Sequence, residues 1–522
     1  MYQYGEADQW LHRYSYDADN RLEWVRTSMD AFLWDEDARY DYYAHGRLAR
    51  VETGHYKVQG SDYFYTLQGW LKGLNMPFAG DPGGDGVNPL RTSTDAFAFA
   101  LGYYQNDYQP IGGTGLALTD GRDKLWTRYA EQHPEQTAAK GLYNGNIAWM
   151  VTDVAELGKQ SGNDRTKGMQ GMLYRYDQVN RIIASRSLTS YAATTGFAAR
   201  TAGVDAAFDT QYSYDPNGNL LTQQRRDDKN GLADDLDYQY YANTNRLQSA
   251  NSTISGEKIY SSGAVKGDDK VYSRIYLQNT AYVASGNSVV LKASEKITTK
   301  ANFTIQAGGS VELQVQDPAL VGGYRYNAIG NLIEDQGEGV TIEWTVYGKV
   351  RQVTHKDGTV VGYHYDATGN RVAKLVTKGS ATTTTRYLRD ASGNVMAIYQ
   401  AEELIEQPIY GSSRMGLYRG GRLPGQRQLG HKQYELSNHL GNVYVTIGDE
   451  KIMTSVSGGS SGPGFDEPGD PDGPPTDPGG DPDALATGNT TVSVTAAIKS
   501  YSHYYPFGLD MPGLGFHSDS YR

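Results

Sequence analysis

Clustered carboxylates are the side chains in this sequence that come closest to forming a metal site, because Ca²⁺ takes oxygen ligands at short spacing. One such cluster consists of Asp227, Asp228, Asn230, Asp234 and Asp235. Its spacing departs from that of a calcium loop, since Arg226 stands where an oxygen ligand is needed and no Glu closes the loop. We therefore expect a solvated hairpin turn here in preference to a calcium site.

A second run of carboxylates lies in a segment of Gly, Ser, Pro and Asp between Ser455 and Asp483. Its acidic residues are Asp466, Asp470, Asp472, Asp477, Asp481 and Asp483. Weak calcium binding is one interpretation, but the interleaved prolines and the scarcity of apolar side chains favour a flexible acidic linker. A glycine-rich stretch, Gly83, Gly84, Asp85 and Gly86, lacks the Lys of a phosphate-binding loop and predicts a plain loop.

Two single residues could take part in acid–base chemistry. His439, within Asn438–Asn442, has no Cys and no obvious carboxylate near it in sequence, so we expect a structural residue that hydrogen-bonds in a turn. Asp510 is the best acid near the end of the chain for a self-cleaving protease site, a hypothesis that we do not favour. The absence of cysteine excludes a thiol nucleophile, a disulfide and a zinc knuckle. We expect no catalytic residue, no cofactor and no metal, and a protein that is not an enzyme.

The dominant pattern of the chain is a repeat of aromatic residues. Eleven stretches carry Tyr-x-Tyr or a looser version, usually followed by Asp or another turn residue, then Gly-Asn or Asn-Arg and an aliphatic residue. The plainest copies begin at Tyr14, Tyr174, Tyr212 and Tyr363, and the looser ones at Tyr40, Tyr63, Tyr238, Tyr324, Trp344, Tyr387 and Tyr434. From Tyr324 to Tyr387 the steps are 20, 19 and 24 residues, which indicates a repeat architecture instead of a single packed core.

Each repeat predicts a β-hairpin. Tyr-x-Tyr places two rings on one face of a strand. In Asp215–Gly218, the Asp opens a type I turn and the Gly supplies a left-handed residue, a role that Asn180 takes in another copy. Stacked hairpins supply neighbours for every edge, and strand twist makes a long stack coil. We expect an all-β fold whose spiralling hairpins form a large hollow barrel or cocoon; a row of β-domains and a propeller are the alternatives.

The composition fits a thin, hydrated wall. The chain has 42 Tyr against 11 Phe and 7 Trp, and 38% of its 522 residues are hydrophobic. Tyrosine can pack its ring while its hydroxyl still reaches water or a partner. A formal net charge of −12 without a basic stripe argues against binding to nucleic acid. No apolar run approaches the roughly 18 residues that would span a membrane.

The repeats divide the chain into predicted segments. A short helix is expected around Arg122–Ala139, with Pro134 as a break, and alternating apolar residues in the insert predict a small β-module. The segments are tyrosine repeats at 1–75, an irregular segment at 76–170, repeats at 171–250, the inserted β-module at 251–320, repeats at 321–452, an acidic linker at 453–490 and a closing segment at 491–522. The chain starts in mid-repeat and stops as if another repeat should begin, so we expect a fragment of a longer protein.

The repeats resemble the Rhs/YD-repeat family, whose relatives are the shells of insecticidal toxin complexes and the teneurin barrel. Four further stretches look similar to Bacteroidetes-type members, namely Asp62–Leu74, Leu142–Met150, Tyr434–Val443 and Tyr504–Pro512. The resemblance covers all but the insert and the acidic linker. It implies a secreted or cell-surface hollow shell of hairpins that encloses a variable C-terminal toxin, a domain absent from this chain.

The resemblance also implies the partners, which are the chain's own C-terminal toxin domain and an immunity protein. Many family members cut the toxin loose with acidic residues, but no Asp-Pro cleavage motif follows Tyr504–Gly508, so self-cleavage is not expected here. The alternative function is a cell-surface adhesin that recognises a glycan or a protein through exposed tyrosines. Neither nucleic acid nor a membrane span is expected.

Overall fold

The computed structural model describes residues 8–77, 92–108, 119–132, 141–155, 169–188, 191–192, 196–198, 206–265, 271–285, 287–299, 303–315, 323–420, 426, 428–457 and 490–517. This part of the chain consists of β-strands and one helix, α1 (Thr119–Gln132), so the expected all-β class is confirmed. The helix begins earlier than predicted, and residues 133–139 lie outside the described part. The glycine-rich stretch 83–86 and the acidic residues from Asp466 to Asp483 also lie outside it.

Consecutive antiparallel strands form the first long sheet. Its strands are β1 (Leu11–Tyr16), β2 (Leu22–Ser28), β3 (Asp35–Tyr42), β4 (Leu48–Thr53), β5 (Gln59–Tyr65), β6 (Leu71–Leu74), β7 (Phe97–Gly102), β8 (Trp149–Val154), β9 (Met169–Tyr176), β10 (Ile182–Leu188), β13 (Thr210–Tyr214), β14 (Leu220–Arg226) and β15 (Leu232–Tyr240). Two short strands, β11 (Tyr191–Ala192) and β12 (Gly196–Phe197), pair separately. Apart from β11 and β12, each strand of this run pairs with the next strand of the run, so the repeats build a continuous meander and not separate blades.

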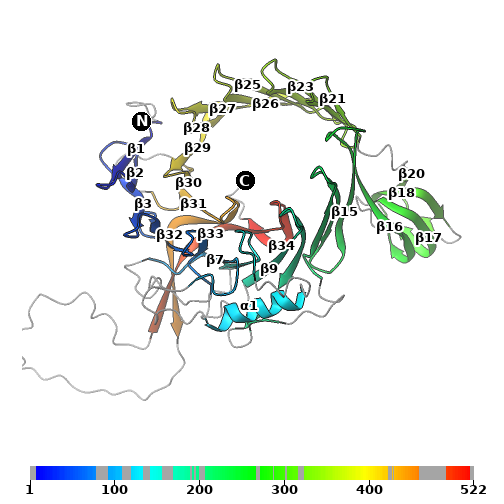
Figure 1. Cartoon of the computed structure of the whole chain (residues 1–522). Helices are drawn as coiled ribbons and strands as arrows, with labels where there is room; N and C mark the ends of the chain where they lie inside the picture. Colours follow the sequence, from blue (N-terminus) through cyan, green and yellow to red (C-terminus); the bar gives the residue numbers. More distant parts are fainter. Residues whose placement is uncertain are drawn as a thin grey trace, which may run out of the picture.

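The insert is a small β-solenoid whose strands pair in parallel. It consists of β16 (Leu247–Ala264), β17 (Val271–Val283), β18 (Ser288–Thr299), β19 (Thr304–Ile305) and β20 (Ser310–Val315). Ser288 pairs with Ser310 on the next coil, and Tyr282 pairs with Thr304. Buried Ile275, Leu277 and Leu291 belong to its own core cluster. Figure 1 shows this module projecting from the outside of the molecule.

A second run of antiparallel strands follows the insert. It contains β21 (Tyr324–Tyr326), β22 (Leu332–Asp335), β23 (Val340–Trp344), β24 (Val350–Thr354), β25 (Val360–Tyr365), β26 (Arg371–Lys378), β27 (Ala381–Arg389), β28 (Val395–Gln400), β29 (Glu403–Tyr410), β30 (Arg414–Tyr418), β31 (Lys432–Ser437), β32 (Val443–Ser457), β33 (Thr490–Tyr504) and β34 (Asp510–His517).

The turns after the aromatic pairs have the predicted geometry. In the turn after β25, the backbone N–H of Gly369 donates to the carbonyl of Asp366 at 3.1 Å, and Gly369 has a φ of 84°. The carboxylate of Asp366 accepts hydrogen bonds from the N–H groups of Thr368 and Asn370, both at 2.9 Å. Asn180 takes the left-handed position in the turn after β9, with a φ of 69°. These positions need Gly or Asn because other side chains are strained there.

At several turns the aromatic residue immediately before the turn links one hairpin to the preceding one. In seven cases its hydroxyl or indole N–H donates to the carbonyl of the first residue of an earlier strand, at 2.6–3.0 Å. The donor and acceptor pairs are Tyr42–Leu22, Tyr214–Ile182, Tyr240–Leu220, Trp344–Leu332, Tyr365–Val350, Tyr410–Val395 and Tyr504–Val443. Phenylalanine has no such donor, which explains why the repeat uses Tyr.

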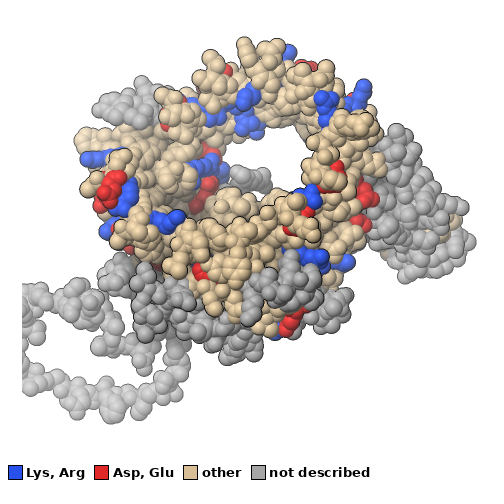
Figure 2. Space-filling model, in the orientation of Figure 1, with Lys and Arg blue, Asp and Glu red and all other residues tan. Residues whose placement is uncertain are grey.

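The two runs of strands curve into a ring (Figure 1), and the space-filling view shows an opening through its middle (Figure 2). Near the insert, Ser249 forms a bridge with Gly323, and Thr94, just before β7, forms one with Thr495 in β33. Among the described strands no ladder joins β34 to β1, so packing completes the ring in place of the continuous hydrogen bonding of a closed barrel. Helix α1 is neither long nor apolar enough to cross a membrane.

Candidate functional site

The most enclosed part of the molecule is the region where strands from the two ends of the chain pack together. We call this region the seam; it contains β1–β9 and β13 on one side and β29–β34 on the other. A single core cluster draws Trp10, Phe97 and Phe99 from the first side and Tyr434 and Tyr444 from the second. The rings of Phe97 and Tyr444 stack with 5.0 Å between centroids. A buried polar site can therefore form here.

A buried ionic cluster crosses the seam between β3 and β31. The Nζ of Lys432 donates to Oδ1 of Asp37 at 2.7 Å and to Oγ1 of Thr27 at 2.8 Å. It also pairs with the carboxylate of Asp35 at 3.0 Å. The hydroxyl of Tyr434 donates to Oδ1 of Asp37 at 3.0 Å, and the hydroxyl of Thr27 donates to Oδ2 of Asp37 at 2.6 Å. Every oxygen of the Asp37 side chain thus has a partner.

The electrostatics of this cluster favour a structural role. Burial alone lowers the pKa of Lys432, but the charges of Asp37 and Asp35 outweigh it and leave that pKa above its ordinary value. Burial, reinforced by Asp37, raises the pKa of Tyr434 well above its usual range. The ammonium therefore stays charged and the phenol stays neutral at any physiological pH. Such groups hold two strands together and offer neither a free base nor a nucleophile.

A second buried lysine lies on the β1–β9 side of the seam. The ammonium of Lys72 in β6 pairs with the carboxylate of Asp107 at 2.8 Å, and both side chains are almost fully buried. It also donates to the backbone carbonyl of Leu101 and lies 4.8 Å from the ring centroid of Trp149. A lysine that is paired, hydrogen-bonded and stacked in this way stabilises the charge inside the core.

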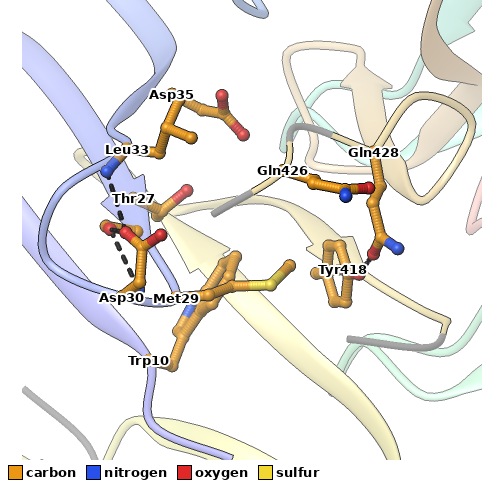
Figure 3. Close-up of a pocket in the computed structure, with 10 residues that line it drawn as sticks. Trp10, Thr27, Met29, Asp30, Leu33, Asp35, Tyr418, Gln426 and Gln428 are labelled. Carbon is orange, nitrogen blue, oxygen red and sulfur yellow. Dashed lines mark hydrogen bonds between the residues drawn. The ribbon is translucent and has the colours of Figure 1, made fainter. Parts of the chain in front are cut away.

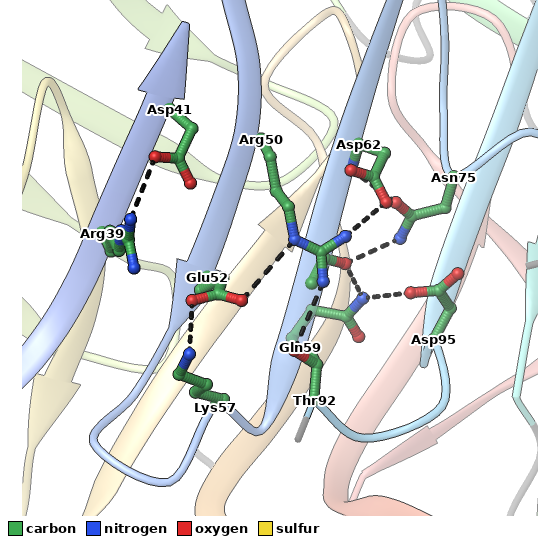
Figure 4. A network of polar contacts seen from close by, with 11 residues as sticks. Arg39, Asp41, Arg50, Glu52, Lys57, Gln59, Asp62, Asn75, Thr92 and Asp95 are labelled. Atoms are coloured by element: carbon green, nitrogen blue, oxygen red, sulfur yellow. Dashed lines mark hydrogen bonds and ion pairs between the residues drawn. The ribbon is translucent and has the colours of Figure 1, made fainter. Parts of the chain in front are cut away.

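A polar network ties β4 and β5 to the segment that leads into β7 (Figure 4). The guanidinium of Arg50 pairs with Asp62 at 2.5 Å and donates to the hydroxyl of Thr92 at 3.3 Å. The amide of Gln59 donates to the carboxylate of Asp95 at 2.8 Å. These bonds hold in place the segment that leads into β7, and the aromatic residues of β7 form the middle of the seam.

A pocket of about 380 Å³, including its solvent-facing space, lies beside the Lys432 cluster. Figure 3 shows side chains of the β1–β3 region, such as Trp10 and Asp30, on one side and Tyr418 and Gln428 on the other. The carboxylate of Asp30 accepts hydrogen bonds from two backbone N–H groups of its own loop, each at 2.8 Å. The hydroxyl of Tyr418 donates to Gln428 at 2.8 Å. Because these polar groups have partners within the protein, we assign the pocket no ligand.

The acidic residues from Asp227 to Asp235 form the hairpin turn that we expected. The carboxylate of Asp227 accepts from the N–H groups of Lys229 and Gly231, at 2.9 and 2.7 Å. Asp234 pairs with Arg225 at 2.6 Å, and Asp235 accepts from Gln224 at 3.0 Å. Asn230 has a φ of 65° and its side-chain oxygen accepts from the N–H of Ala206 at 2.8 Å. The oxygens are directed to separate partners and do not converge on one point.

His439 and Asp510 lie apart from any cluster of acids in the described residues. The turn around His439 is hydrogen-bonded by Asn438, whose side-chain oxygen accepts from the N–H groups of Leu440 and Asn442. The ring of His439 instead packs against Phe99 at 6.1 Å, which corrects the expected hydrogen-bonding role because the ring points into the core. Asp510 is exposed at the start of β34, opposite Tyr504 in the ladder.

Sequence reasoning missed the Lys432 cluster. Strand β3 is rich in charged residues, as a strand that faces water would be, so Asp37 carries no signal of burial. A weak signal exists in β31, where Lys432 shares a face with Tyr434 and Leu436, and all three are buried. A lysine that lies on the same strand face as large apolar residues is expected to be buried, and a buried ammonium group needs a carboxylate partner.

No protein-family model and no curated protein sequence matches this chain. Solved structures of Tc toxin complexes resemble it. The crystal structure of TcdB2-TccC3 without its hypervariable C-terminal region has a TM-score of 0.49 and 14% identity, over 98% of this chain and 17% of that chain. The crystal structure of TcdB2-TccC3 has a TM-score of 0.20 and 13% identity, over 98% and 24%. The Tc holotoxin pore of Photorhabdus luminescens has a TM-score of 0.20 and 12% identity, over 98% and 23%.

This chain spans less than a quarter of the length of each of these three neighbours. The fold assignment rests on the strands and hydrogen bonds of this chain itself.

Proposed function

We propose that this chain is a non-enzymatic shell of the Rhs/YD-repeat type, related to the Bacteroidetes members, from a secreted bacterial polymorphic toxin. In this proposal the shell surrounds and delivers a C-terminal effector domain encoded beyond Arg522. The observation that carries the proposal is the ring itself. Its strands enclose an opening (Figure 2), and β34, the last described strand, borders that opening in Figure 1.

The thickness of the wall supports the role of a container. From residue 323 to residue 395 every residue is partly or fully exposed, so the wall is a single sheet with water on both faces. A globular domain buries a core between two layers, whereas a single layer encloses the most space for its length. The pairing of the buried lysines with carboxylates also supports a role without catalysis.

The proposed partners are the chain's own effector and an immunity protein that neutralises it in the producing cell. The test is to read the gene beyond Arg522 and to express its full product. We expect a further domain that resists a protease and is inactive until it is cut from the shell. A matched control carries the same domain in the exposed turn between β26 and β27, where it should be digested quickly. A gene without a further domain, or equal digestion at both positions, would contradict the proposal.

A recognition function is the second candidate, and exposed apolar side chains at turn tips favour it. Ile329, Val346 and Tyr347 lie in neighbouring turns of the thin wall with 80%, 93% and 88% of their surface exposed. Exposed aromatic residues suit contacts with sugars and proteins. A glycan array should then give a signal that is lost on replacing Val346 and Tyr347 with Ser. A signal no higher than that of an unrelated β-protein would rule this function out.

A further inference from the structure

Three histidines lie at the seam, His503 buried and His12 and His439 half-buried, and each contacts the opposite side of it. His12 in β1 lies 6.4 Å from the ring of Tyr410 at the end of β29. His439, in the turn after β31, lies 6.1 Å from the ring of Phe99 in β7. His503, in β33, is buried, with only 7% of its surface exposed. The histidines therefore come from separate places in the chain and meet the same interface.

The ring nitrogens of these histidines have few neighbouring groups that could stabilise the positive charge of a protonated ring. Nε2 of His12 and Nδ1 of His439 are buried and have no hydrogen-bond partner among the described residues. Nδ1 of His503 lies 3.5 Å from the hydroxyl of Thr152 in β8, a long contact with a neutral group. The ring of Tyr444 meets His503 edge-on at 5.7 Å. A positive charge on His439 or His503 would have no compensating acceptor among the described residues. His12 has one hydrogen bond to the backbone carbonyl of Pro408, and this bond offsets only part of the cost of burial.

The charged groups around the histidines do not offset this cost. Burial lowers the pKa of His12 to about 4, and the opposing influence of Asp37 is countered in part by Lys432. Burial is the sole cause that lowers the pKa of His439 to about 4, and the same holds for His503. For both of these rings the described surroundings are neutral, namely Phe99 for the first and Thr152 and Tyr444 for the second.

We propose that the seam is an acid-sensitive latch, in which protonation of His12, His439 and His503 separates β29–β34 from β1–β9 and opens the ring. The thin wall opposite stays paired, because none of its strand contacts depends on an enclosed histidine. The latch is a property of this chain and does not depend on whether the ring holds an effector. Acid would thus act on a junction that is held by side-chain packing and not by a continuous ladder of backbone hydrogen bonds.

The direction of the pH effect follows from linkage. A histidine whose pKa falls from 6.5 to about 4 on closure is neutral in the closed ring, so the open ring binds more protons between these values. Closure is fully favoured above about pH 6.5, weakens as the pH falls, and loses no more below about pH 4. At pH 5 each histidine shifts the equilibrium toward opening by roughly thirtyfold.

The test is hydrogen exchange of the whole chain, read by segment, from about pH 7.5 to about pH 4.5, with rates corrected for the intrinsic pH dependence of exchange. Exchange in β31 and β33 is compared with exchange in β25 and β26. We expect the corrected ratio of seam to wall exchange to rise by more than about thirtyfold, the contribution of one histidine, as the pH falls to 5. The variants His439→Gln and His503→Gln should each reduce that rise by about thirtyfold, the factor that one histidine contributes. The matched control His364→Gln changes an exposed histidine in β25 and should leave it unchanged.

Two outcomes would overturn the latch. One is a ratio that stays constant down to about pH 4.5 in the unchanged chain. The other is a full acid response in a variant that carries both Gln replacements and folds normally at pH 7.5. Should both replacements prevent folding, the pH series of the unchanged chain decides the matter alone, because a constant ratio contradicts the proposal and a rise confined to the seam supports it.

Discussion

The seam and the opposite wall are made of the same repeat, yet they are stabilised in different ways. At the seam, strands distant in sequence share a core of aromatic residues and a buried ionic cluster. In the wall from residue 323 to residue 395, no residue is buried, and each hairpin contacts mainly its neighbours. We call this second region the arc. Strand pairing, turn residues and aromatic links are therefore sufficient for the repeat to form a sheet. Closing that sheet into a ring also needs tertiary packing between distant strands.

The largest expected effect is on the buried cluster of the seam. Lys432→Met leaves Asp37 buried without its cation, and we expect the free energy of unfolding to fall by about 3–5 kcal/mol. The matched change in the arc is Arg386→Met, which removes an ion pair with Glu402 whose side chains are 51% and 91% exposed. Arg386→Met should lower the free energy of unfolding by less than about 0.5 kcal/mol. Urea unfolding of both variants measures the difference, and equal losses would erase the distinction between the two regions.

The next effect concerns a turn of the arc. Gly348 has a φ of 72°, and an added Cβ would meet nothing within 4 Å, so Gly348→Ala tests backbone strain alone. We expect Gly348→Ala to lower the free energy of unfolding by about 1–2 kcal/mol. Gly348→Asn should be close to neutral, because Asn20 and Asn180 hold the same turn position with φ values of 62° and 69°. Thermal unfolding compares the two variants; a loss as large for Asn as for Ala would show that something other than φ decides the position.

The smallest effect is expected for one aromatic link. Tyr365→Phe removes the hydroxyl that donates to the carbonyl of Val350 at 2.8 Å and keeps the ring. We expect a loss of about 0.5–1 kcal/mol, since the carbonyl is only partly shielded from water. Tyr347→Phe is the control, because that side chain is 88% exposed at a turn tip. If the two variants have the same stability in urea, the hydroxyl links do not stabilise the arc.

What could be predicted from sequence follows the same division. The turn after Asp215 was predictable because a few adjacent residues determine it, and Gly218 has the expected left-handed conformation. The hydroxyl links could not be predicted, because the carbonyl that accepts from Tyr365 is known only once the register of two strands is known. The ionic cluster was out of reach, because Lys432 and Asp37 are 395 positions apart. In the insert, alternating apolar residues predict β-strands but do not distinguish parallel from antiparallel pairing.

The hydroxyl links have a consequence for how such a molecule can change its size. Each link reaches back only to the preceding hairpin, so a hairpin can be duplicated or deleted in the arc without a new kind of contact. The number of hairpins then determines the circumference, while the thickness of the wall stays the same. Gene duplication of one repeat would enlarge the enclosed space in small, regular steps, and only the fit at the seam would limit how many steps are tolerated.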